Sequence, residues 1–253
     1  MKNHLGDVIM MGTDNNEKRG LVSKNFAYTG CDNLEVMTVA KRYNRFLTNL
    51  VTKTAKNIDG KKILDFGAGS GTYADLLRQQ GVSVDCLEPD VILRKSLGAK
   101  GHKVYEDVSK LSKKSYDIVY SFNVFEHIED DFDVASLVVK SIKPGGTLII
   151  YVPAFQMLYS SMDKKVEHVR RYRLDRLRKL ASENQLLIQE AHYCDPVGFF
   201  AALSYKYLGN EDGSLSIRAI KFYDTCIFPV SQLIGFVTKK AFGKNALLIA
   251  KKI

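Results

Sequence analysis

Short apolar runs alternate with amphipathic stretches along the middle of the chain, between residues 61 and 192. The runs have the length of buried strands, and the stretches between them repeat apolar residues at helical spacing. This alternation predicts a doubly wound α/β fold, in which crossover helices cover a parallel sheet. The predicted strands are 63–66, 82–87, 104–106, 116–122, 147–152 and 186–192, and the predicted helices are 73–80, 91–97, 132–142 and 174–184.

The chain before this core holds an arm and one helix. Residues 1–20 are polar and aperiodic, which predicts a loosely held arm. Beyond the arm, apolar residues recur at helical spacing from Val36 to Thr54, behind the capping candidates Asp32 and Asn33. The pattern predicts an amphipathic helix that lies on the core.

The chain after residue 195 departs from the alternation. Two apolar helical stretches flank a polar break at 210–214, and the last residues predict one more strand. We therefore expect four parts. They are an N-terminal arm and helix (1–58), the α/β core (59–195), a helical insertion (196–245) and a closing core strand (246–253).

Composition and charge narrow the class of protein. The 253 residues are 45% hydrophobic and 26% charged, which excludes collagen-like, low-complexity and wholly disordered chains. No apolar run approaches the roughly 18 to 20 residues of a membrane span, and the N-terminus lacks a signal pattern, so we expect a cytoplasmic protein. The net charge of +9 would attract phosphate-bearing substrates, nucleic acid or an anionic membrane surface, and it does not choose among them.

The most informative segment is a buried strand that runs into a glycine-rich turn and a helix, from Ile63 to Thr72. Glycines let the backbone turn sharply and approach a ligand closely, with helix N–H groups pointing at it. A nucleotide-like ligand is therefore expected. The spacing disfavours a nicotinamide cofactor, because Thr72 occupies the third glycine position of the dinucleotide fingerprint.

With Asp65 in front of Gly67, Gly69 and Gly71, this segment resembles the first motif of the class I S-adenosylmethionine (SAM)-dependent methyltransferases. Further matches follow in the family's order through residue 152, and as a set they are specific. They are Glu88 with Pro89 and Asp90 after the second strand, Asp107 with Val108 after the third, residues 117–127 ending in Glu126 and His127, and Lys143 to Leu148. The resemblance implies a Rossmann-like sheet of seven strands whose last strand is antiparallel. The chain departs from the minimal family pattern at the helical insertion between strands six and seven, which we expect to be a substrate cap.

The resemblance also implies SAM as methyl donor and S-adenosylhomocysteine as product. In the family the acid after the second strand binds the ribose hydroxyls, and the position after the third contacts adenine. Tyr43 belongs to a Tyr-Asn element that resembles one closing the donor pocket, although core packing competes as its role. The implied donor-binding set is Asp65, Gly67, Ala68, Gly69, Gly71, Glu88, Pro89, Asp107, Val108, Asn123 and Tyr43.

Because a sulfonium is already an activated methyl donor, the enzyme mainly has to align the reactants and remove a proton. No metal is required, and we expect none. The two candidate bases are His127 and His168, since imidazole titrates near neutral pH. A helix-capping role competes for His127, and the acidic residues around it, Glu126 to Asp133, fit the first turn of a helix better than a magnesium site.

A second constellation, residues 162–172, follows the fifth strand. It resembles the Asp…His-x-Arg-Arg-Tyr loop of a bacterial methyltransferase subgroup that tailors polysaccharides and other small molecules, except that Glu167 stands where a glycine often precedes the histidine. Asp163 would orient His168. The implied acceptor-binding residues are Arg170, Arg171 and Tyr172, joined by Tyr28 from the N-terminal part, while internal pairing of an arginine is the competing interpretation.

The sequence therefore predicts methyl transfer to a small-molecule or lipid- or sugar-linked acceptor, at oxygen, by in-line displacement with a histidine base. An RNA methyltransferase is the alternative that the charge favours, but the Asn/Asp-Pro-Pro-Tyr/Phe motif is absent where Ser121 to Val124 stand. A SAM-binding protein without transferase activity is the third possibility. The aromatic and basic insertion predicts peripheral contact with the inner membrane surface, a homodimer interface or a simple lid.

Overall fold

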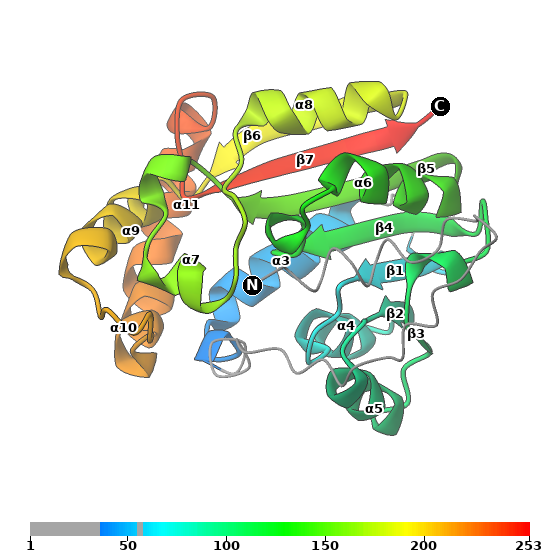
Figure 1. Ribbon diagram of the computed structural model, residues 1–253, viewed down its shortest axis with the longest axis horizontal. Helices are drawn as coiled ribbons and strands as arrows, with labels where there is room; N and C mark the ends of the chain where they lie inside the picture. The colour runs from blue at the N-terminus through cyan, green and yellow to red at the C-terminus, as the bar shows by residue number, and fades with distance from the viewer. Residues whose placement is uncertain (1–35, 55–57) are drawn as a thin grey trace, which may run out of the picture.

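The computed structural model describes residues 36–54 and 58–253, and its centre is one seven-stranded sheet (Figure 1). The strands are β1 (Ile63–Phe66), β2 (Val84–Leu87), β3 (Val104–Tyr105), β4 (Tyr116–Phe122), β5 (Ile142–Pro153), β6 (Leu186–Cys194) and β7 (Asn245–Lys252). They lie in the order β3-β2-β1-β4-β5-β7-β6. Strand β7 runs antiparallel to β5 and β6, whereas β1 to β5 pair in parallel. The predicted doubly wound fold with an antiparallel last strand is confirmed.

Helices cover both faces of this sheet (Figure 1). Alternate residues of each strand enter opposite layers, so that Leu148 and Ile150 of β5 pack with helices α6 and α8, while Ile149 and Tyr151 pack with α3 and α4. The helices are α3 (Lys41–Thr54), α4 (Thr72–Arg78), α5 (Val91–Ala99), α6 (Asp131–Ser141), α7 (Ser161–Lys165), α8 (Leu174–Glu183), α9 (Pro196–Leu208), α10 (Ile217–Phe222) and α11 (Phe228–Thr238).

The predicted N-terminal helix is interrupted: Val36 and Met37 are helical, a turn follows, and α3 begins only at Lys41. The physical reason is a cap from far along the chain. The carboxylate of Asp224 accepts hydrogen bonds from the backbone N–H groups of Arg42 and Tyr43, at 3.0 and 2.8 Å, which satisfies donors that a helix start leaves open. The capping candidates Asp32 and Asn33 lie outside the described residues, as does Tyr28.

Strand β5 is longer than predicted, because it begins at Ile142 instead of Thr147. Ile142 pairs with Tyr116, and the register then shifts before Thr147 pairs with Ile118. The residues between, which include Gly145 at a φ of 77°, form an irregular extension of the strand. The sequence predicts a turn for this extension, because it is rich in Pro and Gly.

The helical insertion lies between β6 and β7, as predicted. Helices α10 and α11 are joined by one π-helical stretch, Tyr223–Ile227, so the backbone stays helical from Ile217 to Thr238. The insertion is bonded to the segment after β5 at two points: Lys206 Nζ donates to the Met157 carbonyl, and Ser161 Oγ donates to the Asn210 carbonyl, each at 2.7 Å. Among the described residues, no helix is both long and apolar enough to cross a membrane.

Candidate functional site

The glycine turn after β1 has the conformation that the sequence predicted. Gly67, Gly69 and Gly71 all have positive φ, at 81°, 55° and 85°, a region that other residues rarely adopt. The N–H groups of Gly67 and Ala68 both donate to the Leu87 carbonyl at 3.0 Å, which fixes the turn against the end of β2. A Cβ at Gly67 would lie 2.4 Å from Val124 Cγ2, so the turn also packs closely on the end of β4.

Two buried carboxylates lie beside this turn. Glu88 accepts hydrogen bonds from the N–H groups of Gly69 at 2.7 Å and Asp90 at 2.9 Å, and it is 5% exposed. Asp65 is 1% exposed and its Oδ2 has no hydrogen-bond partner among the described residues. Burial raises the pKa of both carboxyl groups to about 7. The pair provides negative charge where a cationic, diol-bearing ligand such as SAM would need it, so these residues fit the implied donor.

The other predicted donor-binding residues lie at the same edge of the sheet. Tyr43 of α3 packs edge-on against Tyr151 and Phe228, with ring centroids 6.1 and 5.6 Å away, and the Asn123 side chain lies beside its hydroxyl. Tyr43 thus has the packing role that competed with its pocket role, and it also neighbours a second predicted donor residue.

Asp107 and Val108 follow β3, as the family order requires. The Asp107 carboxylate accepts a hydrogen bond from the Ser109 N–H at 2.6 Å and caps a short 3-10 helix, while Val108 is buried. Contact of these two residues with adenine stays a prediction. Pro89, also in the predicted set, is buried directly after Glu88.

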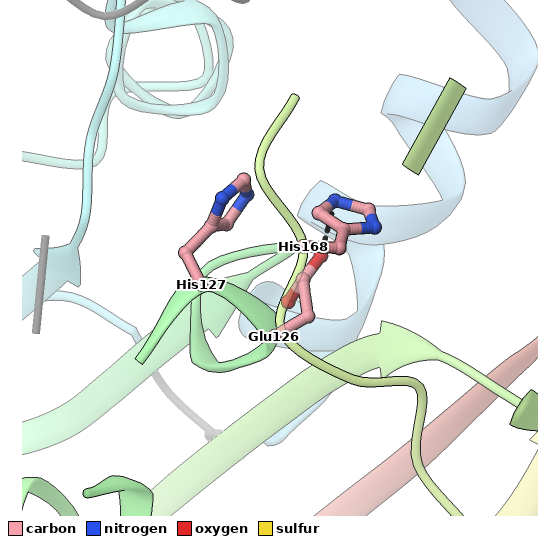
Figure 2. A group of neighbouring side chains, drawn as sticks. All are labelled: Glu126, His127 and His168. Carbon is pink, nitrogen blue, oxygen red and sulfur yellow. Dashed lines mark ion pairs between the residues drawn. The ribbon is translucent and has the colours of Figure 1, made fainter. Parts of the chain in front are cut away.

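A second cluster joins two segments that are far apart in the sequence. Glu126 and His127 lie in a 3-10 turn after β4, and His168 lies in the loop between α7 and α8 (Figure 2). The two imidazole centroids are 4.7 Å apart, and His168 Nε2 is 3.8 Å from Glu126 Oε1. One ligand atom from each of the three residues lies within 4.8 Å of the others. These are the described residues that could hold a metal ion.

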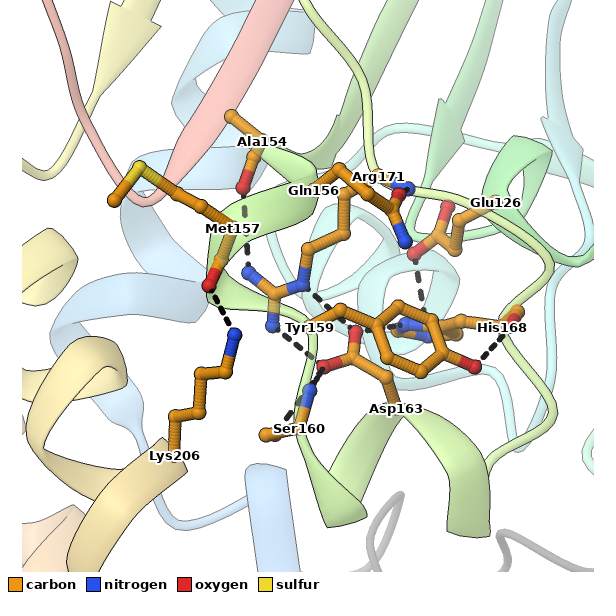
Figure 3. A network of polar contacts seen from close by, with 10 residues as sticks. All are labelled: Glu126, Ala154, Gln156, Met157, Tyr159, Ser160, Asp163, His168, Arg171 and Lys206. Atoms are coloured by element: carbon orange, nitrogen blue, oxygen red, sulfur yellow. Dashed lines mark hydrogen bonds and ion pairs between the residues drawn. The ribbon is translucent and has the colours of Figure 1, made fainter.

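Asp163 holds the loop that carries His168 (Figure 3). Its carboxylate lies 2.7 Å from His168 Nδ1 and accepts hydrogen bonds from Arg171 Nε and Nη2, both at 2.9 Å. It also accepts from the Ser160 N–H, which completes a capping box at the start of α7. Hydrogen bonds from His168 and Arg171 outweigh burial and hold the pKa of the Asp163 carboxyl well below its usual range. The sequence-based expectation that Asp163 orients His168 agrees with this geometry.

Burial decides the charge of the three clustered side chains. It lowers the pKa of His127 and of His168, so both imidazoles are neutral near pH 7. Burial raises the pKa of the Glu126 carboxyl well above its ordinary value. Both Glu126 oxygens lack a hydrogen-bond partner on any other described residue, and the side chain is 0% exposed.

Three residues that the sequence predicts to bind the acceptor make hydrogen bonds to other parts of the protein. Arg170 donates to the carbonyls of Ile128 and Glu129. Arg171 is 6% exposed and its donors serve Asp163 and the Ala154 carbonyl. The Tyr172 side chain is fully buried, and its hydroxyl donates within the core. The structure thus shows the internal pairing that competed as their role, and direct contact of these residues with an acceptor stays a prediction.

The acidic residues from Glu126 to Asp133, which the sequence predicts to form one helical turn, belong to two different elements. Asp131 and Asp133 lie in the first turn of α6, as expected, whereas Glu126 belongs to the buried 3-10 turn before that helix. The signal that could have distinguished it is its position directly after the buried strand β4. Its closeness to His168, 42 positions further on, leaves no trace in the spacing.

Comparison with known proteins gives the family context. The model of the family described as "Methyltransferase domain" matches residues 39–191. Ubiquinone biosynthesis O-methyltransferases from Aliivibrio fischeri and Photobacterium profundum are 31% and 32% identical over 113 residues, which are 41% of this chain and 48% of theirs. The matched part thus spans about half the length of these curated relatives.

Solved structures show the same fold at low identity. A SAM-dependent methyltransferase from Archaeoglobus fulgidus superposes with a TM-score of 0.54 at 16% identity, covering 83% of this chain and 94% of the other. Coclaurine N-methyltransferase, solved with N-methylheliamine and S-adenosylhomocysteine, has a TM-score of 0.56 at 12% identity, covering 83% and 72%.

Proposed function

This chain belongs to the family of proteins that carry the methyltransferase domain, and on that premise we propose that it transfers a methyl group from SAM to an oxygen of a small-molecule or lipid- or sugar-linked acceptor. The observation that carries the proposal is the left-handed turn of Gly67, Gly69 and Gly71 with the buried carboxylates Asp65 and Glu88 beside it. The oxygen preference follows the relatives named ubiquinone biosynthesis O-methyltransferases.

SAM supplies a methyl group on a sulfonium, so that the C–S bond breaks as the C–O bond forms and the electron pair stays on sulfur in S-adenosylhomocysteine. Glu88 would accept hydrogen bonds from the ribose, and Asp65 would complement the donor's positive charge. Asp107, Val108, Pro89, Asn123 and Tyr43 would line the rest of the pocket. These roles follow from their shared edge of the sheet and from the family resemblance.

The acceptor hydroxyl must also lose a proton. In the metal-free protein His168 is the proposed proton acceptor, because Asp163 holds Nδ1 at 2.7 Å and leaves Nε2 facing Glu126 and His127. His127 would contact the acceptor beside it. Arg171 acts as a positioning residue through Asp163.

The helical insertion carries the proposed partner surface. Leu233, Phe236 and Val237 of α11 are 69%, 76% and 87% exposed, and Lys239 and Lys240 follow them on the surface. Exposed apolar side chains beside lysines suit the interface of an anionic membrane. We therefore propose a cytoplasmic protein that makes peripheral contact with the inner membrane surface through this face, with a homodimer through the same face as the competing arrangement.

The function is tested by transfer of radiolabelled methyl from SAM into a host-cell extract that retains its membranes. We expect label in the organic phase for a lipid-linked acceptor, or in the aqueous phase for a soluble metabolite or sugar. Nuclease-sensitive macromolecular label would instead support an RNA methyltransferase. SAM binding without label in any fraction would support a binding protein without transferase activity.

Glu88→Gln is expected to weaken SAM binding about 10- to 150-fold, since a charged hydrogen-bond acceptor is worth roughly 1.5 to 3 kcal/mol. Because the pKa of Glu88 is raised to about 7, its ionised fraction rises from about a tenth at pH 6 to about nine tenths at pH 8. Wild-type affinity should therefore rise with pH over this range, and calorimetry should find a flatter profile in the variant. We assign the pH dependence that remains in the variant to Asp65, whose pKa is also raised to about 7. Unchanged affinity and an unchanged profile would remove Glu88 from the ribose site.

His168→Gln is expected to lower turnover by about 10²- to 10⁴-fold, the usual contribution of a positioned proton acceptor. SAM affinity should stay within about twofold of wild type, because His168 lies outside the donor set. The matched control is His192→Gln on β6, a half-buried histidine away from the cluster, which should leave both quantities unchanged. Full turnover in His168→Gln would exclude the assigned role.

A further inference from the structure

Glu126 is a buried carboxylate to which no other described residue donates a hydrogen bond. Its side chain is 0% exposed, and neither of its oxygens has a hydrogen-bond partner on another residue in the described part of the chain. Arg171, whose positive charge acts on Glu126, already donates two hydrogen bonds of 2.9 Å to Asp163. A buried carboxylate needs a hydrogen-bonded counter-charge, and no described side chain supplies one here.

Two imidazoles face this carboxylate, and each has a fixed outer partner. His168 Nδ1 lies 2.7 Å from the Asp163 carboxylate, so that Nε2 is turned toward Glu126 (Figure 3). The His127 ring interacts with the Val166 carbonyl on its own side. Histidines that bind metal ions in proteins usually have their second ring nitrogen hydrogen-bonded to a carboxylate or a backbone carbonyl.

We propose that Glu126, His127 and His168 bind one divalent transition-metal ion of the Zn²⁺ type (Figure 2). Two imidazole nitrogens and one carboxylate oxygen suit Zn²⁺, Fe²⁺, Co²⁺ or Mn²⁺. Mg²⁺ and Ca²⁺ prefer oxygen ligands throughout. The three ligand atoms lie within 4.8 Å of one another, and a tetrahedral ion with bonds of about 2.1 Å would draw them to roughly 3.4 Å.

The position of the cluster suggests a catalytic role for this ion, and that role rests on the proposed function. Glu126 follows Val124 by two residues, and Val124 packs directly against the glycine turn, so the cluster borders the donor pocket. Three protein ligands leave a coordination position for the acceptor's hydroxyl oxygen. A bound cation would lower the pKa of that hydroxyl. In the metal-loaded enzyme His168 would be a ligand and not the base: the cation would make the hydroxyl more acidic, and its proton would pass to solvent water.

The test uses Co²⁺ as a spectroscopic probe on the full chain, purified without a histidine tag and stripped with a chelator. We expect one Co²⁺ per chain with a visible absorption band, and we expect Zn²⁺ to displace it. Glu126→Gln and His127→Phe should each weaken Co²⁺ binding by at least about 100-fold. His102→Gln is the matched control, because His102 also pairs with a carboxylate, at 2.8 Å from Asp75, but away from the cluster. Its Co²⁺ affinity should equal that of wild type.

Circular dichroism on each variant separates a lost ligand from a lost fold, and the two cluster variants provide independent tests. The absence of a Co²⁺ band in folded wild-type protein would overturn the inference, as would equal affinity in wild type and both cluster variants. SAM affinity is measured on the same samples by calorimetry. Co²⁺ binding without SAM binding would contradict the proposed function while supporting the metal site, and full methyl transfer by stripped protein would overturn the role of the ion.

Discussion

Replacement of Asp163 by alanine is expected to lower the free energy of unfolding by about 3 to 5 kcal/mol. The Asp163 side chain is 0% exposed, and its oxygens accept two hydrogen bonds from Arg171 and two from Ser160, with His168 as a further partner. The variant leaves the Arg171 guanidinium buried, charged and without its carboxylate. Urea unfolding followed by circular dichroism measures the loss.

Two further variants test that explanation. Glu183→Ala removes the carboxylate of an exposed pair on α8, 3.7 Å from Lys179, and should cost no more than about 0.5 kcal/mol. The double variant Asp163→Leu/Arg171→Met removes both buried charges and should recover much of the lost stability. A loss below about 1 kcal/mol in Asp163→Ala would show that the buried pair does not hold this loop.

Gly67→Ala is expected to destabilise the protein by about 2 to 5 kcal/mol and to abolish measurable SAM binding. Its φ of 81° costs an ordinary residue roughly 1 to 2 kcal/mol. The added Cβ would also lie 2.4 and 2.6 Å from the two methyl carbons of Val124, and overpacking of this kind costs about 1 to 3 kcal/mol. Relief of the contact would displace the turn from the donor.

Gly81 provides the control, because its φ is also 81° but a Cβ there would meet nothing within 4 Å. Gly81→Ala should therefore show only the backbone cost and keep SAM affinity. The double variant Gly67→Ala/Val124→Ala should regain part of the stability. If Gly67→Ala proves no more harmful than Gly81→Ala, the close approach of the turn to β4 does not matter for the donor site.

The order of elements was predictable because it depends on local patterns. A short, mostly apolar run of four to seven residues is enough to mark a buried strand such as β4. The glycine spacing at 67, 69 and 71 is a requirement on φ that acts within the turn itself. The boundaries that differ have long-range causes. Strand β5 begins early through pairing with β4, and α3 begins late where Asp224, about 180 positions away in the sequence, caps it.

The sequence by itself determined the fold and the family, and it located the glycine turn at which we propose that the donor binds, because each follows from residue types at short spacing. Only the tertiary structure decided which charged side chains remain available for chemistry. It assigns Arg171 to Asp163 and encloses Tyr172, whose types alone suggested acceptor contact. It also brings Glu126 beside His168. Burial and choice of partner depend on how distant segments pack, and no short-range pattern records that.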